Sequence, residues 1–564
     1  MRKAVTISGY LLARELRNGP NTQLGWYRPR WPGASRPVIA SDTVSGWLDR
    51  FFGAYYARRP VNATFIGVHR HDHALPDYSE AGAGDTVAEM KSLLAEATHL
   101  NEPSSAIEAV DLKLAQGYLE TQVWEFESLH FHRGNPSVYT GEAIFGVMAF
   151  LLSSQPPSAT KIEAAIARLQ AIPTLLRQGQ QVLKSAPRGW TERARRECQG
   201  ARHFLGDGVA HLVAEGIIAH RGLLPAAGIA LVAFEDFDRF LAEELLPRPT
   251  EGYAAGEEAL RRYLTAGHHI TTAPDDIARY AEAQLRQAKA ALAEFPAPTA
   301  PAAERRDYHT VWEEARRVAI DRDLLSWPES PIHYQPRPAW AAAAAPYLYF
   351  LYYRSPAAFD RPAVHHYLVP PDYPGSSAVK LNHVVHHGGI GHHVQNWHAF
   401  QASSRIGQVA AVDCASRIAL FCGGTMAEGW ACYATDLMNE VGYLTAEERR
   451  DELATRCRMC ARAVVDVRLH TGRYGPTEAT DYYQREAGMD PVAAAGEVVK
   501  NSMFPGTALM YVMGTDRIHE LRRTMSARLG AEFSLRRWHD SFLSYGSIPV
   551  SQIAALMIGD PHAL

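Results

Sequence analysis

The chain has 564 residues, of which 47% are hydrophobic and 21% charged, and its formal net charge is −4 at pH 7. This composition allows a large buried core, and the length exceeds what one ordinary domain holds. Together they indicate a globular protein of enzyme size. Because acidic and basic residues are interspersed, no basic stripe is available to neutralise phosphates. The composition therefore argues against nucleic-acid binding and favours a small-molecule or short peptide substrate.

The compartment is predicted from the cysteines and the apolar segments. Six cysteines are sparse for this length and lack framework spacing, which favours free thiols in a reducing compartment. The amino end has a short apolar stretch, but Ser8, Gly9 and Arg14 make it too polar for a signal peptide. The longest apolar run, 338–353, contains Pro346 and is shorter than the ~20 residues that cross a bilayer. We expect a cytoplasmic protein without a membrane segment.

Helical periodicity dominates the chain, and strand signals are few. The fold class predicted from this pattern is mostly α. Amphipathic helices are expected at 84–100, 105–123, 158–186, 226–246, 276–294, 304–325, 425–440, 445–470, 491–503, 507–529 and 534–545.

Three of these boundaries carry recognisable capping residues. Thr445 with Glu448 forms a capping-box pattern, and Asp490 precedes Pro491 as an N-cap before a proline at the first helical position. Gly530 follows a predicted helix end, where glycine commonly terminates a helix.

Two further segments bear on the organisation of the chain. Residues 296–303 read PAPTAPAA, which cannot sustain a helix and marks either a surface loop or a lobe boundary. We predict an N-terminal helical lobe (1–300) and a C-terminal helical lobe (301–564) with the functional site, or one continuous domain. Extended pieces at 332–335 and 364–368 predict a small edge sheet near the active-site cleft.

The chemistry is concentrated in two motifs. Residues 385–395 read VHHGGIGHHVQ, and residues 427–433 read AEGWACY. Neutral imidazoles plus one carboxylate are the donor set with which Zn²⁺ or Fe²⁺ keeps an open coordination position. The sequence therefore predicts a divalent-metal site with His386, His392 and Glu428 as ligands.

The histidine spacing requires a departure from a regular helix. His386 and His392 are six residues apart, whereas ligands on one helical face are usually four apart. Gly388, Gly389 and Gly391 lie between them and permit a broken or overwound turn, so that two half-helices point at one place.

Other interpretations of this patch remain open. His383 and His387 are four apart and form a competing register, and a third register uses His393 in place of His392. A polar core network or a solvent-facing run would also explain clustered histidines, and Glu428 alone would be an ordinary carboxylate near a helix start.

These motifs resemble those of the bacterial family named domain of unknown function 885. VHHGGIGHHVQ is similar to its HExxPGHHxQ motif, and AEGWACY resembles its EGWAxY motif. Further similarities cover nearly the whole chain: Pro60, Thr64, Gly67 and LPD at 75–77; Trp124, Asn135, Pro136 and Tyr139; VVDVRLH at 464–470; Pro505, Ala508, Tyr511, Gly514 and Arg522; and WHDSFLSYGSIP at 538–549.

The resemblance implies a large helical, metallopeptidase-like body with a catalytic divalent cation, zinc first, held by His386, His392 and Glu428. One departure matters most: the family's glutamate after the first histidine is His387 here, and its proline is Ile390. That glutamate would be the general base, whose loss typically costs roughly 10²–10⁴ in rate. His387 is therefore a substitute base, an extra ligand or a sign of lost activity.

The resemblance also suggests supporting residues. Tyr511 would donate a hydrogen bond to an oxyanion, or else pack in the core. Asp466 and His470, four apart on a helix, would form an outer shell or proton relay, or else an ordinary surface pair. Arg468 stands where the family has glycine, and Arg522 would bind a substrate carboxylate or face solvent.

Three functions follow as hypotheses. The first is a metal-dependent hydrolase of amide or peptide-like bonds with an altered general base. The second is a catalytically inactive relative that binds a metal or ligand, which the missing glutamate favours. The third is a non-haem iron enzyme that uses two histidines and one glutamate, because this donor set serves Fe²⁺ as well as Zn²⁺.

Overall fold

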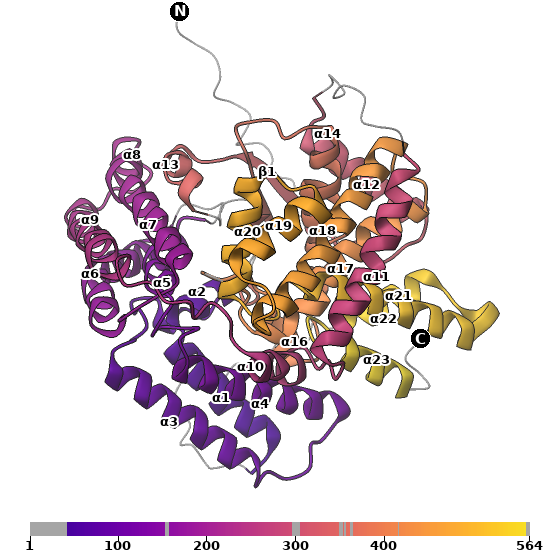
Figure 1. The fold of residues 1–564 in the computed structure, drawn as a ribbon, viewed down its shortest axis with the longest axis horizontal. Helices are drawn as coiled ribbons and strands as arrows, with labels where there is room; N and C mark the ends of the chain where they lie inside the picture. The colour runs from indigo at the N-terminus through magenta and orange to yellow at the C-terminus, as the bar shows by residue number, and fades with distance from the viewer. Residues whose placement is uncertain are drawn as a thin grey trace, which may run out of the picture. The chain divides into compact units, whose positions relative to one another are not determined.

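The computed structural model describes residues 42–152, 157–295, 305–348, 353–354, 357–360, 365–415 and 417–559. The predicted polar amino end and the 296–303 segment lie outside these residues. Helices make up most of the described chain, which confirms the mostly α fold class (Figure 1). The helices before the sheet are α1 (Val44–Arg58), α2 (Pro60–Ile66), η1 (His69–His71), α3 (Glu80–Ala97), α4 (Ala106–Glu127), α5 (Ser137–Met148), α6 (Ala159–Val182), α7 (Arg188–His203), η2 (Phe204–Gly208), α8 (Val209–Ala214), α9 (Leu223–Phe240), η3 (Leu241–Leu245), α10 (Glu257–Arg262), η4 (Tyr263–Gly267), α11 (Pro274–Ala293) and α12 (Tyr308–Asp321).

The remaining helices include those that carry the candidate site. Their bounds are α13 (Ala339–Ala342), η5 (Ala345–Tyr347), α14 (Ser376–Ala378), η6 (Val379–Gly388), α15 (His392–Ala399), α16 (Arg405–Val409), η7 (Phe421–Gly423), α17 (Gly424–Glu440), α18 (Ala446–His470), α19 (Pro476–Ala487), α20 (Pro491–Met503), α21 (Met510–Leu529), η8 (Gly530–Glu532), α22 (Leu535–Ser544) and α23 (Val550–Gly559).

Every predicted helix is present, and the three capping predictions are confirmed. Thr445 and Glu448 form a reciprocal capping box, Asp490 accepts from two backbone N–H groups, and Gly530 follows the last residue of α21. The apolar periodicity did not predict every helix, and α5 is one that it did not predict. All twelve of its residues are buried, so no polar face alternates with an apolar one.

A three-stranded sheet lies beside the histidine-rich segment, as predicted. β1 (Ile332–Pro336) pairs in parallel with β3 (His365–Val369), and β2 (Tyr353–Arg354) pairs antiparallel with the other edge of β3. Tyr334 of β1 and Tyr367 of β3 contact His383 of η6 through hydrogen bonds. The sheet therefore supports one side of the segment that carries the metal-type residues.

Residues from Asp42 onward form one compact unit. Within it, α6, α7, α8 and α9 pack together, and α11 packs along α18 (Figure 1). α11 precedes residue 300 and α18 follows it, and their apolar faces share one buried cluster. Elements on both sides of residue 300 therefore pack together. The division into lobes at that residue stays a prediction. None of the helices among the described residues is both long and apolar enough to span a membrane.

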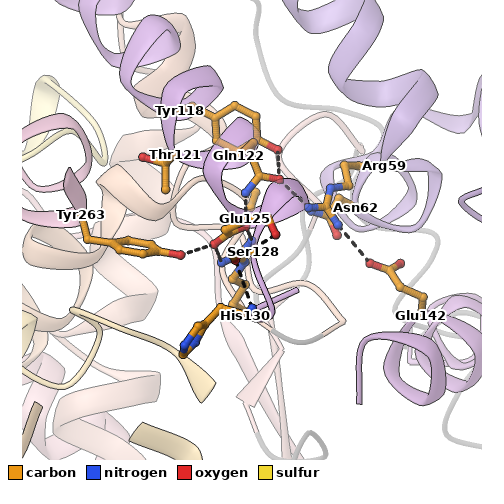
Figure 2. A network of polar contacts seen from close by, with 12 residues as sticks. Arg59, Asn62, Tyr118, Thr121, Gln122, Glu125, Ser128, His130, Glu142 and Tyr263 are labelled. Atoms are coloured by element: carbon orange, nitrogen blue, oxygen red, sulfur yellow. Dashed lines mark hydrogen bonds and ion pairs between the residues drawn. The ribbon is translucent and has the colours of Figure 1, made fainter. Parts of the chain in front are cut away.

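A buried polar network fixes the segment that leads into α17. Figure 2 shows Arg59 between Gln122 and Glu142, and Tyr263 pointing at Glu125. Both carboxylate oxygens of Glu125 also accept from Arg417, each at 2.6 Å. Because Arg417 precedes α17 and Glu125 lies on α4, this ion pair ties the start of α17 to the N-terminal helices.

Candidate metal centre

The histidine-rich segment begins as a π-helix, η6, and restarts as an α-helix, α15. In the wide turn the N–H of Gly389 donates to the carbonyl of Val384 at 2.6 Å, and the N–H of Gly391 donates to that of Val385 at 2.9 Å. A Cβ on Gly391 would overlap the carbonyl oxygen of His386, so only glycine fits there. The predicted break is present, but the turn is widened rather than overwound, as π-turns at functional sites often are.

This break brings three predicted ligands to one place. Nε2 of His386 and Nε2 of His392 lie 3.5 Å and 3.6 Å from the same oxygen, Oε2 of Glu428 on α17. The two imidazole planes are 89° apart with ring centroids 5.0 Å apart. The three side chains are 12% to 20% exposed, so a ligand from solvent can reach them. That they bind a metal stays a prediction.

The protonation states of His386 and Glu428 suit a bound cation. Burial lowers the pKa of His386, although Glu428 opposes this shift, so the imidazole is neutral. Burial alone would raise the pKa of Glu428, but the imidazoles of His386 and His392 hold it well below its ordinary value. Neutral imidazoles and an ionised carboxylate are the forms that ligate divalent metals.

His387 joins the same cluster. Ring nitrogens of His386, His387 and His392 lie within 4.8 Å of one another. Nδ1 of His387 lies 2.7 Å from the carbonyl oxygen of Asn382. Because a carbonyl oxygen only accepts, Nδ1 carries the proton and Nε2 keeps its lone pair. This tautomer suits a substitute base and an extra ligand equally.

The alternative registers use histidines that have other partners. His383 shares a hydrogen bond through Nδ1 with the hydroxyl of Tyr367, and Nε2 of His393 donates to the carbonyl of Ser330 at 2.8 Å. Among the residues that the structure describes, the nitrogens that converge belong to His386, His387 and His392.

The residues around the predicted ligands orient them. The indole N–H of Trp430, two residues after Glu428, donates to the carbonyl of Ile390 at 2.9 Å and so fixes the glycine-rich break against α17. Oε1 of Gln395 lies 3.4 Å from Nδ1 of His392, and Nε2 of Gln395 donates to the hydroxyl of Ser547 at 2.6 Å. A proton on Nδ1 of His392 puts the lone pair of the ring on Nε2, the atom near Glu428.

Tyr511 lies beside Arg462, a residue that the sequence motifs did not single out. The Arg462 guanidinium is 5.1 Å from the ring centroid of Tyr511, and Nη2 pairs with Glu497 at 2.7 Å. The charge of Arg462 also acts on His386 and contributes to its lowered pKa, after the larger effect of burial. The sequence did contain a signal for Arg462. It stands inside the apolar run MCARAVV of α18, where a charged residue is unusual unless it has a specific role.

Asp466 and His470 are fully buried, so the surface-pair interpretation was wrong. The Asp466 carboxylate accepts from three backbone N–H groups of residues 506–509 at 2.8 to 3.0 Å. His470 pairs with the carbonyl of Asn501 at 3.0 Å and with the N–H of Ala255 at 3.2 Å. Asp466 therefore anchors the turn that begins α21, and His470 anchors the end of α20. A proton-relay role stays a prediction.

Arg522 is engaged within the protein. Its guanidinium donates to the hydroxyl of Tyr433 at 3.1 Å and to Glu440 at 2.8 Å, both on α17. These contacts hold α17 against α21. The N–H groups of Arg522 that a substrate carboxylate would need are therefore used within the protein.

Comparisons with known proteins extend these findings. The chain matches the family described as "Bacterial protein of unknown function (DUF885)" over residues 60–557. No curated protein matches the chain.

Two solved structures share the fold. One is "a putative lipoprotein of unknown function from Shewanella oneidensis", with 19% sequence identity and a TM-score of 0.69, covering 92% of this chain and 100% of that chain. The other is "the putative lipoprotein from Colwellia psychrerythraea", with 14% identity and a TM-score of 0.70, covering 92% of this chain and 99% of that chain. At these identities the likeness concerns the fold alone.

Proposed function

The chain belongs to the DUF885 family of bacterial proteins of unknown function, and from this premise we propose that it is a metal-dependent hydrolase of amide or peptide-like bonds. His386, His392 and Glu428 would hold the cation.

One observation carries the proposal. The two Nε2 atoms lie 3.5 Å and 3.6 Å from one carboxylate oxygen, too far for strong hydrogen bonds. Ligands at 2.0–2.1 Å from a tetrahedral zinc ion are about 3.4 Å apart, so these separations suit side chains around one cation. Zinc is the first choice, and Fe²⁺ is the alternative because it takes the same donors.

The chain's own groups would then divide the work. A bound zinc ion would polarise a carbonyl oxygen and lower the pKa of a water molecule. His387 would take the proton of that water on Nε2, because its Nδ1–H is committed to Asn382. The hydroxyl of Tyr511 would donate to the oxyanion as it forms.

A second candidate function has its own support. The nitrogen cluster includes His387, so this residue would complete a set of three histidines and Glu428 around the cation. Such a centre lacks a base and fits a catalytically inactive metal-binding relative. If the ion were iron, the centre with two histidines and one glutamate as ligands would fit an oxygen-using enzyme.

Elemental analysis of protein purified without a metal-affinity tag tests the proposal first. Zinc near one equivalent, lost in Glu428→Gln and retained in the control His393→Gln, would support it. Iron would favour the oxygen-using alternative, and absence of any metal would refute all the metal-dependent hypotheses.

His387→Glu tests the hydrolase itself. Restoring the family's glutamate is expected to create or raise cleavage of a broad panel of peptides and amides. If zinc stays bound and nothing is cleaved by either form, the inactive relative becomes the better explanation.

Two observations favour different cellular locations for the protein. All six cysteines are free thiols, which favours the cytoplasm predicted from their sparseness. The two solved structures with this fold are each described as a "putative lipoprotein", which favours a location outside the cytoplasm. Fractionation of cells that express the native gene decides between them.

A further inference from the structure

We propose that Arg462 is the anion-binding residue of this centre and that the substrate carries a carboxylate beside the bond to be cleaved. The inference rests on the proposed function, because it concerns the ligand that this same site would take.

Helix register places Tyr511 near the cluster. α17 and α21 run in the same direction, since Thr515 bonds the carbonyl of Gly429 at 3.3 Å and, further along both helices, His519 bonds Asp436 at 2.8 Å. Tyr511 lies one turn before Thr515 on the same face of α21. It therefore lies level with the first turns of α17, where Glu428 begins the EGW motif.

α18 runs in the opposite direction across α21 and brings Arg462 to the same level. Arg456 pairs with Asp516 at 2.6 Å, and six residues later the guanidinium of Arg462 covers the ring of Tyr511.

The donors of Arg462 are incompletely used. Its side chain is 12% exposed, and Nη2 pairs with Glu497. Nη1 contacts the sulfur of Met459 at 3.5 Å, which is a weak acceptor, and Nε is buried with no hydrogen-bond partner among the described residues. A buried guanidinium with an unmet donor is costly, and its planar fork matches a carboxylate.

Of the other arginines on these helices, Arg468 also has a buried Nε with no hydrogen-bond partner among the described residues, but its guanidinium lies over Tyr474 and pairs with Glu282. Arg456 holds both oxygens of Asp516, and Arg522 holds Glu440 and Tyr433. Arg462 combines an orphaned N–H with a place over the ring of Tyr511, level with the first turns of α17, so we assign the recognition of an anion to it.

The test uses two probes that differ only in charge. Succinic acid monohydroxamate carries a metal-binding hydroxamate and a free carboxylate, and its methyl ester lacks the charge. Their dissociation constants are measured by calorimetry on the zinc-loaded full chain. Charge-assisted hydrogen bonds predict that the acid binds at least about tenfold more tightly than the ester.

Variants assign that preference to Arg462. In Arg462→Met the preference is expected to fall to about unity while zinc content and ester binding stay unchanged. Arg462→Lys should keep part of it, and the control Arg458→Met, one turn earlier and exposed, should keep all of it. If Arg462→Met misfolds because Glu497 loses its partner, the double variant R462M/E497M removes both charges and should give the same loss of preference.

Two results would overturn the inference. Equal binding of acid and ester by the native chain, or a preference that survives in Arg462→Met, would refute anion recognition while leaving the hydrolase proposal intact. If the chain takes up no zinc and binds neither probe, the proposed function fails and the inference falls with it.

Discussion

Gly429 on α17 and Gly514 on α21 lie backbone to backbone: a Cβ on Gly429 would come within 2.7 Å of the Cα of Gly514. The contact immediately follows Glu428 and holds the two helices closer than side chains would allow. It explains why glycine stands inside two helices, where it would otherwise cost about 1 kcal/mol relative to alanine.

Gly514→Ala is therefore expected to destabilise the protein. Its Cβ would overlap the carbonyl oxygen of Thr425, and overpacking of this kind costs typically about 1–3 kcal/mol. Urea unfolding measures the loss. Gly496→Ala in α20 is the control, because it is exposed and a Cβ there meets nothing within 4 Å, so it should stabilise by up to about 1 kcal/mol. Equal effects of the two substitutions would refute the close-approach explanation.

Gln395→Leu is expected to weaken zinc binding without unfolding the chain. Gln395 links Nδ1 of His392 to Ser547, and loss of such an outer partner typically lowers metal affinity about 10–100-fold. Competition with a zinc chelator measures the affinity. The control Gln401→Leu removes an exposed glutamine whose side-chain amide donates to the nearby carbonyl of Trp397. An unchanged affinity in Gln395→Leu would argue that Gln395 does not orient a ligand.

Glu125→Met is expected to be strongly destabilising, by roughly 3–5 kcal/mol, because it leaves Arg417 without its bidentate partner in the buried network (Figure 2). The double variant E125M/R417M should recover part of this loss. Glu127→Met removes a surface pair with Lys91 and should change the free energy of unfolding by less than about 1 kcal/mol. A double variant less stable than the single one would contradict the ion-pair account.

The pH dependence of stability is expected to include a contribution from His69. Hydrogen bonds to Asp360 and Asp72 raise the pKa of His69 to about 9, above its ordinary value of 6.5. A raised pKa stabilises the folded state fully below about pH 6.5, and this stabilisation is lost as the pH rises through 9. The midpoint temperature of thermal unfolding should therefore be lower for His69→Gln than for the native chain at pH 6. At pH 10 the two midpoints should be nearly equal. A gap that is the same at both pH values would refute the prediction.

Local patterns were sufficient for much of the fold. Amphipathic periodicity predicted the helices with one apolar face, and side-chain chemistry predicted boundaries such as Thr445 and Asp490, because a cap is made by residues within one turn of each other. α5 escaped because burial on every side removes the periodic signal.

The sequence by itself determined the helical class, the family and the three residues that converge, since histidines, glycines and the EGW motif record local chemistry. Only the tertiary structure decided that the turn widens into a π-helix, that His387 joins the cluster while His393 faces Ser330, and that Asp466 and His470 are buried anchors. It also placed Arg462 over Tyr511. The reason is physical: the contacts of His393, Asp466, His470 and Arg462 join residues 31 or more positions apart in the chain, and no local pattern encodes which faces meet.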